Sequence, residues 1–89
     1  MTVKQHAEQL EKLKALELFL LKENVLLTRQ ELRVLYEAVE GKGNAEIAQL
    51  MHVCLGTIKT HKHNLITKLG IQGKDEFRKY TAKLAKTLP

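Results

Sequence analysis

The sequence is poor in the residues that mark disulfide-bonded, hairpin-rich and membrane-spanning proteins. It has one cysteine, Cys54, so no internal disulfide can form, and a lone thiol is typical of a reducing cytoplasm. The single proline is the last residue and the five glycines fall in short clusters, which favours helices over hairpins. No apolar run approaches the ~20 residues that span a bilayer, and the N-terminus does not resemble a signal peptide. We therefore predict a cytoplasmic, all-helical protein that does not enter a membrane.

Positive charge is concentrated in the last third of the chain. From Met1 to Cys54 there are seven Lys and Arg against eight Glu, a net charge of −1. From Leu55 to Pro89 there are eight Lys and Arg against Asp75 and Glu76, a net charge of +6. Such an asymmetry indicates a polyanionic partner, nucleic acid before membrane, although a solvated lysine-rich surface has the same composition.

The first 24 residues form a segment distinct from residues 25–89, which we predict to be one domain. Apolar residues recur at spacings of three and four from Val3 to Leu21, which predicts an amphipathic helix. Leu18, Phe19 and Leu21 widen its apolar stripe, so this helix either folds back on the domain or meets a partner. The stripe consists of Val3, Ala7, Leu10, Leu13, Leu16 and Leu20.

The remaining residues predict four further helices. Thr28 and Glu31 have the spacing of a capping box, which begins a second helix that ends at Gly41 and Gly43. Asn44 is a good N-cap for a short third helix through Met51, with Ile47, Leu50 and Met51 facing inward. After a tight turn at 52–54, a fourth helix runs from Leu55 to Leu69 and ends at Gly70. Asp75 is then predicted to cap a fifth helix with Phe77, Tyr80, Thr81, Leu84 and Leu88 along one face.

Residues 44–69 have the pattern of two helices that cross at a steep angle around a three-residue turn. Such a crossing tolerates only a small side chain, and Ala48 lies there, with a shared core of Ile47, Met51, Val53 and Ile58. On the helix after the turn, Ile58, Leu65 and Leu69 fall within about 20° of one another and must face the core. The opposite face has Gly56, Lys59, Thr60, His63, Asn64 and Thr67. A polar face without carboxylates suits the major groove of duplex DNA, because base edges mix donors and acceptors and phosphates repel acids. An ordinary solvated face is the alternative reading.

These residues, taken in series, resemble the LuxR/GerE-type helix-turn-helix over residues 26–84. The opening motif is Leu27-Thr28 with Glu31 and Val34-Leu35. The turn and second helix are Gly41, Asn44 and Glu46-Ile47-Ala48. The recognition helix and its exit are Thr57-Ile58-Lys59 with His61, Asn64 and Lys68-Leu69-Gly70-Ile71.

The resemblance implies a four-helix DNA-binding domain, here with an additional N-terminal helix, that acts as a sequence-specific transcriptional regulator. Its third helix, here about 55–69, would enter the major groove, and Lys59, Thr60 and His63 would reach bases. Thr57, Lys62 and the amides near Asn44 would hold phosphates. The last helix of the family often forms a dimer, which points to Phe77, Tyr80 and Leu84 as the interface.

The sequence departs from the family's pattern at the start of the recognition helix. Cys54 stands where a capping serine is usual, and losing that cap costs ~1 kcal/mol of helix stability. Leu55 and Gly56 replace polar or charged residues, and His63 replaces the usual lysine or arginine with a titratable side chain.

No metal, cofactor or catalytic role is expected. His61 and His63 are two residues apart, hence about 200° apart on a helix, and cannot chelate one ion together. No nucleophile is placed beside a base and no carboxylate pair lies in an apolar setting. Cys54 as a redox switch is a remote alternative to a quiet thiol.

Two questions about partners stay open. Helix-turn-helix domains also bind proteins. The chain is therefore alternatively an anti-activator whose apolar first helix binds and covers a partner regulator. We also predict a homodimer on a two-fold DNA site, because apolar surface is in surplus at both ends of the chain. We favour the last helix as the contact and keep the first helix as the alternative. In the simplest alternative, both faces pack on the central helices of a monomer.

Overall fold

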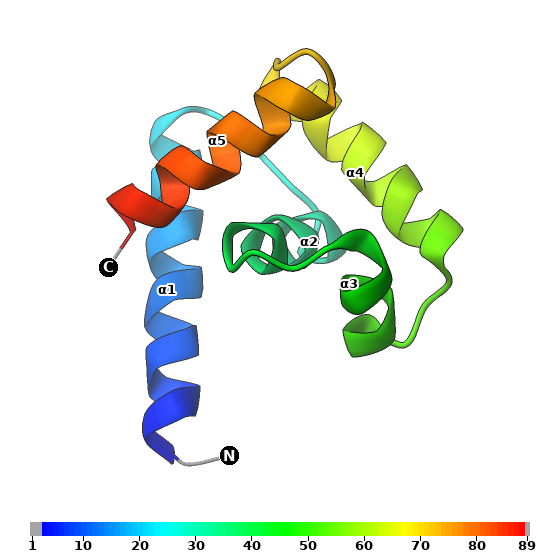
Figure 1. The fold of residues 1–89 in the computed structure, drawn as a ribbon. Coiled ribbons are helices and arrows are strands. Elements are labelled where there is room, and N and C mark those ends of the chain that lie inside the picture. The colour runs from blue at the N-terminus through cyan, green and yellow to red at the C-terminus, as the bar shows by residue number, and fades with distance from the viewer. Residues whose placement is uncertain (1–2, 89) are drawn as a thin grey trace.

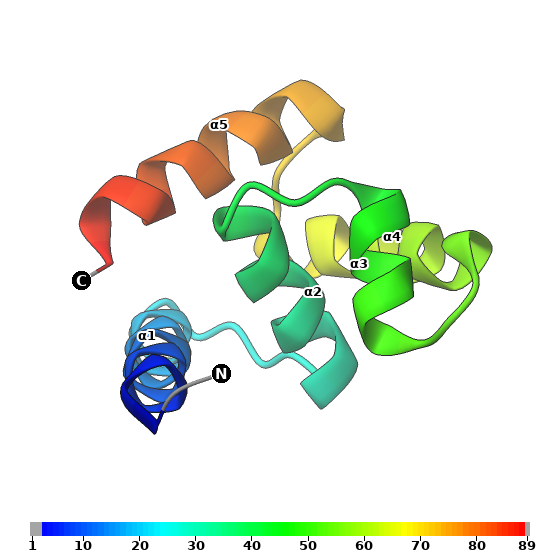
Figure 2. The same cartoon turned by 60° about the horizontal axis from the view of Figure 1, so that its bottom comes forward.

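Every other helix packs against one central helix. The computed structural model describes the backbone of residues 3–88 and the side chains of residues 9–88. Its helices are α1 (Val3–Lys22), α2 (Arg29–Val39), α3 (Asn44–Met51), α4 (Leu55–Leu69) and α5 (Gly73–Thr87). Figures 1 and 2 show α1 and α4 on opposite sides of α2, with α5 above. The all-helical prediction is confirmed for the described residues.

The core lies where α2 meets the other four helices. Its fully buried side chains are Leu16, Val34, Leu35, Ile47, Ile58 and Leu65. Ile47, Ile58 and Leu65 were predicted to face inward, and Leu69 is half-buried beside them. Because α2 contributes Val34, Leu35 and Tyr36 to this core, it carries the scaffold on which α3, α4 and α5 are mounted.

The start of α2 is locked by the predicted capping box. The Glu31 amide donates to Thr28 Oγ1 (3.2 Å), and the Thr28 amide donates to Glu31 Oε1 (2.9 Å). Lys68, at the end of α4, donates to the same carboxylate at 2.6 Å. Burial alone raises the pKa of Glu31, but Lys68 and Thr28 outweigh it and hold this pKa below its ordinary value. Glu31 therefore fastens α4 to α2 as a carboxylate.

Replacing Glu31 by glutamine is expected to lower the free energy of unfolding by about 1–2 kcal/mol at neutral pH, because the charge-assisted bond to Lys68 is lost. A depressed carboxyl pKa stabilises the fold above its unfolded value near 4.5 and ceases to do so as pH falls through the lower folded value. Urea unfolding of both proteins in a series of buffers should therefore give stability curves that converge in acid. Parallel curves would contradict the assignment.

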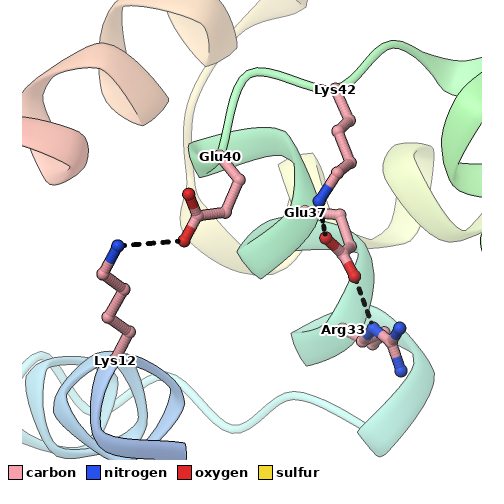
Figure 3. A network of polar contacts seen from close by, with 5 residues as sticks. All are labelled: Lys12, Arg33, Glu37, Glu40 and Lys42. Carbon is pink, nitrogen blue, oxygen red and sulfur yellow. Dashed lines mark hydrogen bonds and ion pairs between the residues drawn. The ribbon is translucent and has the colours of Figure 1, made fainter. Parts of the chain in front are cut away.

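A second buried carboxylate fixes the loop between α2 and α3. Glu37 accepts from Arg33 Nε (2.8 Å) and from Lys42 Nζ (2.7 Å), as Figure 3 shows. Burial alone raises the pKa of Glu37. The hydrogen bonds and charges of Lys42 and Arg33 outweigh this effect and hold the pKa below its ordinary value. Lys42 lies in the loop itself, so this ion pair sets the path of the chain into α3. Beside it, Lys12 of α1 meets Glu40 at 3.5 Å.

Two predicted helix starts are wrong. Gly43, with an extended backbone (φ −83°, ψ 170°), is the N-cap of α3, so Asn44 is already the first helical residue. α5 begins at Gly73 after the N-cap Gln72, and Asp75 lies inside its first turn. The Gln72 amide instead donates to a Glu76 carboxylate oxygen at 2.9 Å. In both places the sequence offers a good capping side chain, but the helix begins before that residue, which therefore lies inside the helix.

Two side chains predicted to face the core do not. Leu50 and Val53 are 43% and 37% exposed. α3 has only eight residues, and Leu50 lies about 110° around it from the face that Ile47, Ala48 and Met51 present. On α1, Leu10 is 56% exposed whereas Leu16 is fully buried, because the two residues lie about 120° apart around the helix. The side chains of Val3 and Ala7 lie outside the described residues.

Candidate nucleic-acid interface

The helix-turn-helix forms as the sequence predicts. His52, with a left-handed backbone (φ 57°), reverses the chain after α3, and α4 begins at Leu55. Ala48 of α3 and Ile58 of α4 are both buried in the common core, and these two helices are in contact. α4 ends at Gly70, whose φ of 71° suits a residue without a Cβ. The second helix is therefore held rigidly against α2 and α3, with its far side in solvent.

The far side of α4 presents the polar face that the helical wheel predicted. All six of its residues are exposed: Gly56, Lys59, Thr60, His63, Asn64 and Thr67. The Thr60 hydroxyl donates to the Gly56 carbonyl (3.1 Å) and the Thr67 hydroxyl to the His63 carbonyl (3.0 Å). Each hydroxyl oxygen therefore keeps its acceptor lone pairs toward solvent. α4 contains neither Asp nor Glu, so nothing on it repels a phosphate.

No side chain caps the first turn of α4, in agreement with the predicted weak cap. Cys54 is the N-cap and is exposed, and its side chain makes no capping hydrogen bond. Leu55, the first helical residue, is 42% exposed. The Thr57 amide donates to the Cys54 carbonyl at 3.1 Å, so the amides of Leu55 and Gly56 are left for an outside acceptor, next to the apolar side chain of Leu55.

A basic cleft of about 850 Å³ adjoins the polar face. It lies between the loop at 41–43 with the start of α3, α4 and the first half of α5, and its lining includes Ile66 and Phe77. Its cationic lining consists of Lys42, Lys59, Lys62, Lys74 and Arg78, with His63 at the same wall. Among the described residues that line it there is no Asp or Glu. Such a cleft is electrostatically complementary to phosphate.

Three of these cations crowd one another. Lys62 is half-buried, with Nζ 5.2 Å from the centroid of the Phe77 ring. Burial lowers the pKa of Lys62, and the nearby charges of Lys74 and Arg78 lower it further. Among the described residues, only Lys42 of these cations has an acidic partner, Glu37. The rest of the positive charge is unbalanced in the free protein, and a bound anion would relieve it.

The predicted contact residues divide between these two surfaces. Lys59, Thr60 and His63 share the polar face, and Lys59 and His63 also border the cleft. Lys62 and Asn44 line the cleft, whereas Thr57 is half-buried at the start of α4. Asn44 Oδ1 is buried and has no hydrogen-bond partner among the described residues. The side-chain amide of Asn44 therefore lies at the cleft and does not cap α3.

Sequence reasoning missed Lys74 and Arg78 on α5. They lie four residues apart, hence on one face of a helix, and the charge of the last third contained the signal. The packing of α5 that places this face next to α4 could not be predicted from the sequence.

The predicted dimer residues lie mostly inside the protomer. Phe77 and Leu84 are buried in its core, and Tyr80 is half-buried. A dimer contact through these three residues stays a prediction, and it would have to open that core.

Neither a metal centre nor a membrane span emerges from the described residues. No three His, Cys, Asp or Glu side chains in this part of the chain are grouped so as to hold a metal ion. None of its helices combines the length and apolar character that crossing a bilayer requires.

Comparison with known proteins identifies the same region. The profile of bacterial regulatory proteins of the luxR family matches residues 25–80, which include the helix-turn-helix. Relatives include the oxygen regulatory protein NreC of Staphylococcus aureus strains JH9 and JH1, each 38% identical over 58 residues. The match covers 65% of this chain and 27% of each relative, so the chain matches about a quarter of their length. No solved structure matches the chain.

Proposed function

The chain belongs to the LuxR family of bacterial regulatory proteins, which are DNA-binding transcription regulators, and we propose that it reads a specific duplex sequence with α4 in the major groove. The observation that carries this proposal is the exposed, carboxylate-free face of α4 continuous with the basic cleft. Base edges would meet Lys59, Thr60 and His63. Phosphates of the flanking strand would meet the cleft, at Lys62 and near Asn44.

Replacing Lys59 by alanine is expected to weaken binding to a preferred duplex by about 1–3 kcal/mol, because a lysine that reaches a guanine edge discriminates by that amount. The duplex is first selected from random DNA, and affinity is measured by fluorescence anisotropy. Lys83→Ala is the matched control, since Lys83 is an exposed lysine of α5 outside the cleft. Equal affinities for the two variants would contradict the placement of α4.

We further propose that two copies read one two-fold symmetric site. A single recognition helix reads only a few base pairs, and paired helices about 34 Å apart read two half-sites. The outer face of α4 is free in the protomer, so pairing elsewhere on the molecule leaves it available. A footprint that covers both halves of a palindromic site supports the pair.

A second candidate is a protein-interaction module. The observation in its favour is the row of exposed apolar side chains around the turn, namely Leu50, Val53 and Leu55. Titration of duplex DNA at two salt concentrations separates the two functions. Salt-dependent binding supports the DNA reader, because lysine contacts release counterions from the phosphates. No binding at low salt would favour the interaction module.

A further inference from the structure

The N-terminal helix carries two apolar surfaces, only one of which the protomer uses. Leu16 and Leu20 are buried against α2, with Leu13 half-buried beside them. Leu10, Leu18 and Leu21 are 56%, 60% and 56% exposed. These three are the most exposed large apolar side chains described on any helix, since Leu26 lies in a loop.

The exposed surface has the spacing of a coiled-coil seam. Leu10, Lys14, Glu17 and Leu21 follow one another at intervals of four, three and four residues. At 100° per residue they fall within about 60° of one another, roughly 100° from the face buried on α2. We call this row the outer seam of α1. Lys14 and Glu17, at its centre, are exposed and carry opposite charges.

We propose that the outer seam binds the outer seam of a second copy of this chain, with the two α1 helices antiparallel. A two-fold axis that crosses the helix midway between residues 15 and 16 places Leu10 opposite Leu21 of the partner copy. The same axis places Lys14 opposite Glu17 of the partner copy. One operation therefore pairs every position of the seam with a complementary one, apolar with apolar and cation with anion.

The charges disfavour a parallel pair. In a parallel pair Lys14 would face Lys14 and Glu17 would face Glu17, and like charges at a seam are unfavourable. Leu18 lies next to Lys14 and Leu21 on the flank of the seam, and it adds apolar area in the antiparallel pair. This assignment moves the dimer contact from α5 to α1, outside the matched residues 25–80.

The pair leaves the DNA-binding surface free. α1 and α4 lie on opposite sides of α2 in both views, so copies joined through α1 leave both α4 helices uncovered (Figures 1 and 2). The inference names the contact for the proposed dimer and rests on that dimer, but it needs no DNA. It is therefore tested separately from DNA recognition.

The test is the association constant of the full chain without DNA, measured by sedimentation equilibrium. Lys14→Glu and Glu17→Lys are each expected to lower this constant about tenfold, because each variant puts two like-charge contacts into the pair. The double variant Lys14→Glu/Glu17→Lys should recover the parent value to within a factor of about three, since it restores both opposite-charge contacts. Recovery supports the pair where circular dichroism shows equal helix content in the parent and all three variants, because Lys14 and Glu17 are also three residues apart on α1 and interact within it.

An apolar control completes the experiment. Leu10→Glu should leave the chain monomeric and folded by circular dichroism, whereas Leu26→Glu, at a more exposed leucine off the seam, should leave association unchanged. A parent chain that is monomeric at every concentration would overturn the proposal and leave the seam to a partner of different sequence. A double variant as weak as the single ones would also overturn it. Anisotropy with the selected duplex is measured in parallel, so that a failure of DNA binding is recognised as such.

Discussion

Replacing Lys62, Lys74 and Arg78 together by alanine is expected to lower the affinity for duplex DNA roughly hundredfold at moderate salt. The three side chains line one basic cleft whose described lining has no carboxylate. The burial of Lys62 and the charges of Lys74 and Arg78 depress its pKa, so the free protein holds these cations together at a cost. A DNA phosphate in the cleft would relieve this repulsion, and the triple variant removes that gain.

The salt dependence of binding identifies the lost contacts. The slope of log affinity against log salt should become shallower by about three, one unit for each phosphate contact that disappears. The triple variant Lys79→Ala/Lys83→Ala/Lys86→Ala is the matched control, because it removes the same charge from exposed positions of α5 outside the cleft. If both triples weaken binding equally, only net charge matters and the cleft is no phosphate site. Thermal unfolding of the variant checks that Phe77, which Lys62 covers, stays packed.

Local sequence signals predicted the elements that depend on neighbouring residues alone. The capping box at Thr28 and the left-handed Gly70 fix the start of α2 and the end of α4, and the structure places both as predicted. The spacing of Ile58 and Leu65 likewise set the buried face of α4, and so its exposed face. The DNA-reading face followed from the sequence because one helical period determines it.

Features that depend on how helices meet were not predictable in the same way. The cleft joins Lys42, Lys62 and Lys74 from three elements, and no spacing along the chain brings them together. Apolar residues recur at helical spacing along α1 through Leu10 and Leu16, yet these two lie about 120° apart, and Leu10 is 56% exposed whereas Leu16 is buried. The spacing of apolar residues predicts that α1 is a helix. It does not state which of its apolar faces a neighbouring helix covers.

The same limit applies to the fifth helix. We predicted that the fifth helix has surplus apolar surface at Phe77, Tyr80 and Leu84. The sequence predicts the other four helices, but it does not show how those helices pack or how much space they leave for these side chains. In the structure α2 and α5 are in contact, and Phe77 and Leu84 are buried in the common core. The exposed residues of α5 that remain are mostly Lys, Arg, Asp and Glu.

Replacing Leu84 by glutamate is therefore expected to unfold the chain rather than only to dissociate a dimer. Leu84 is 2% exposed within one protomer, so the variant loses a buried leucine and buries an unpaired carboxylate. Together these changes cost about 4 kcal/mol or more, a large part of the stability of a small domain. Circular dichroism and urea unfolding should show little helix at neutral pH. Ala85→Glu, at an exposed position one residue on, should unfold like the parent chain. A Leu84→Glu protein that stays helical while a parent dimer becomes a monomer would instead return the dimer contact to α5.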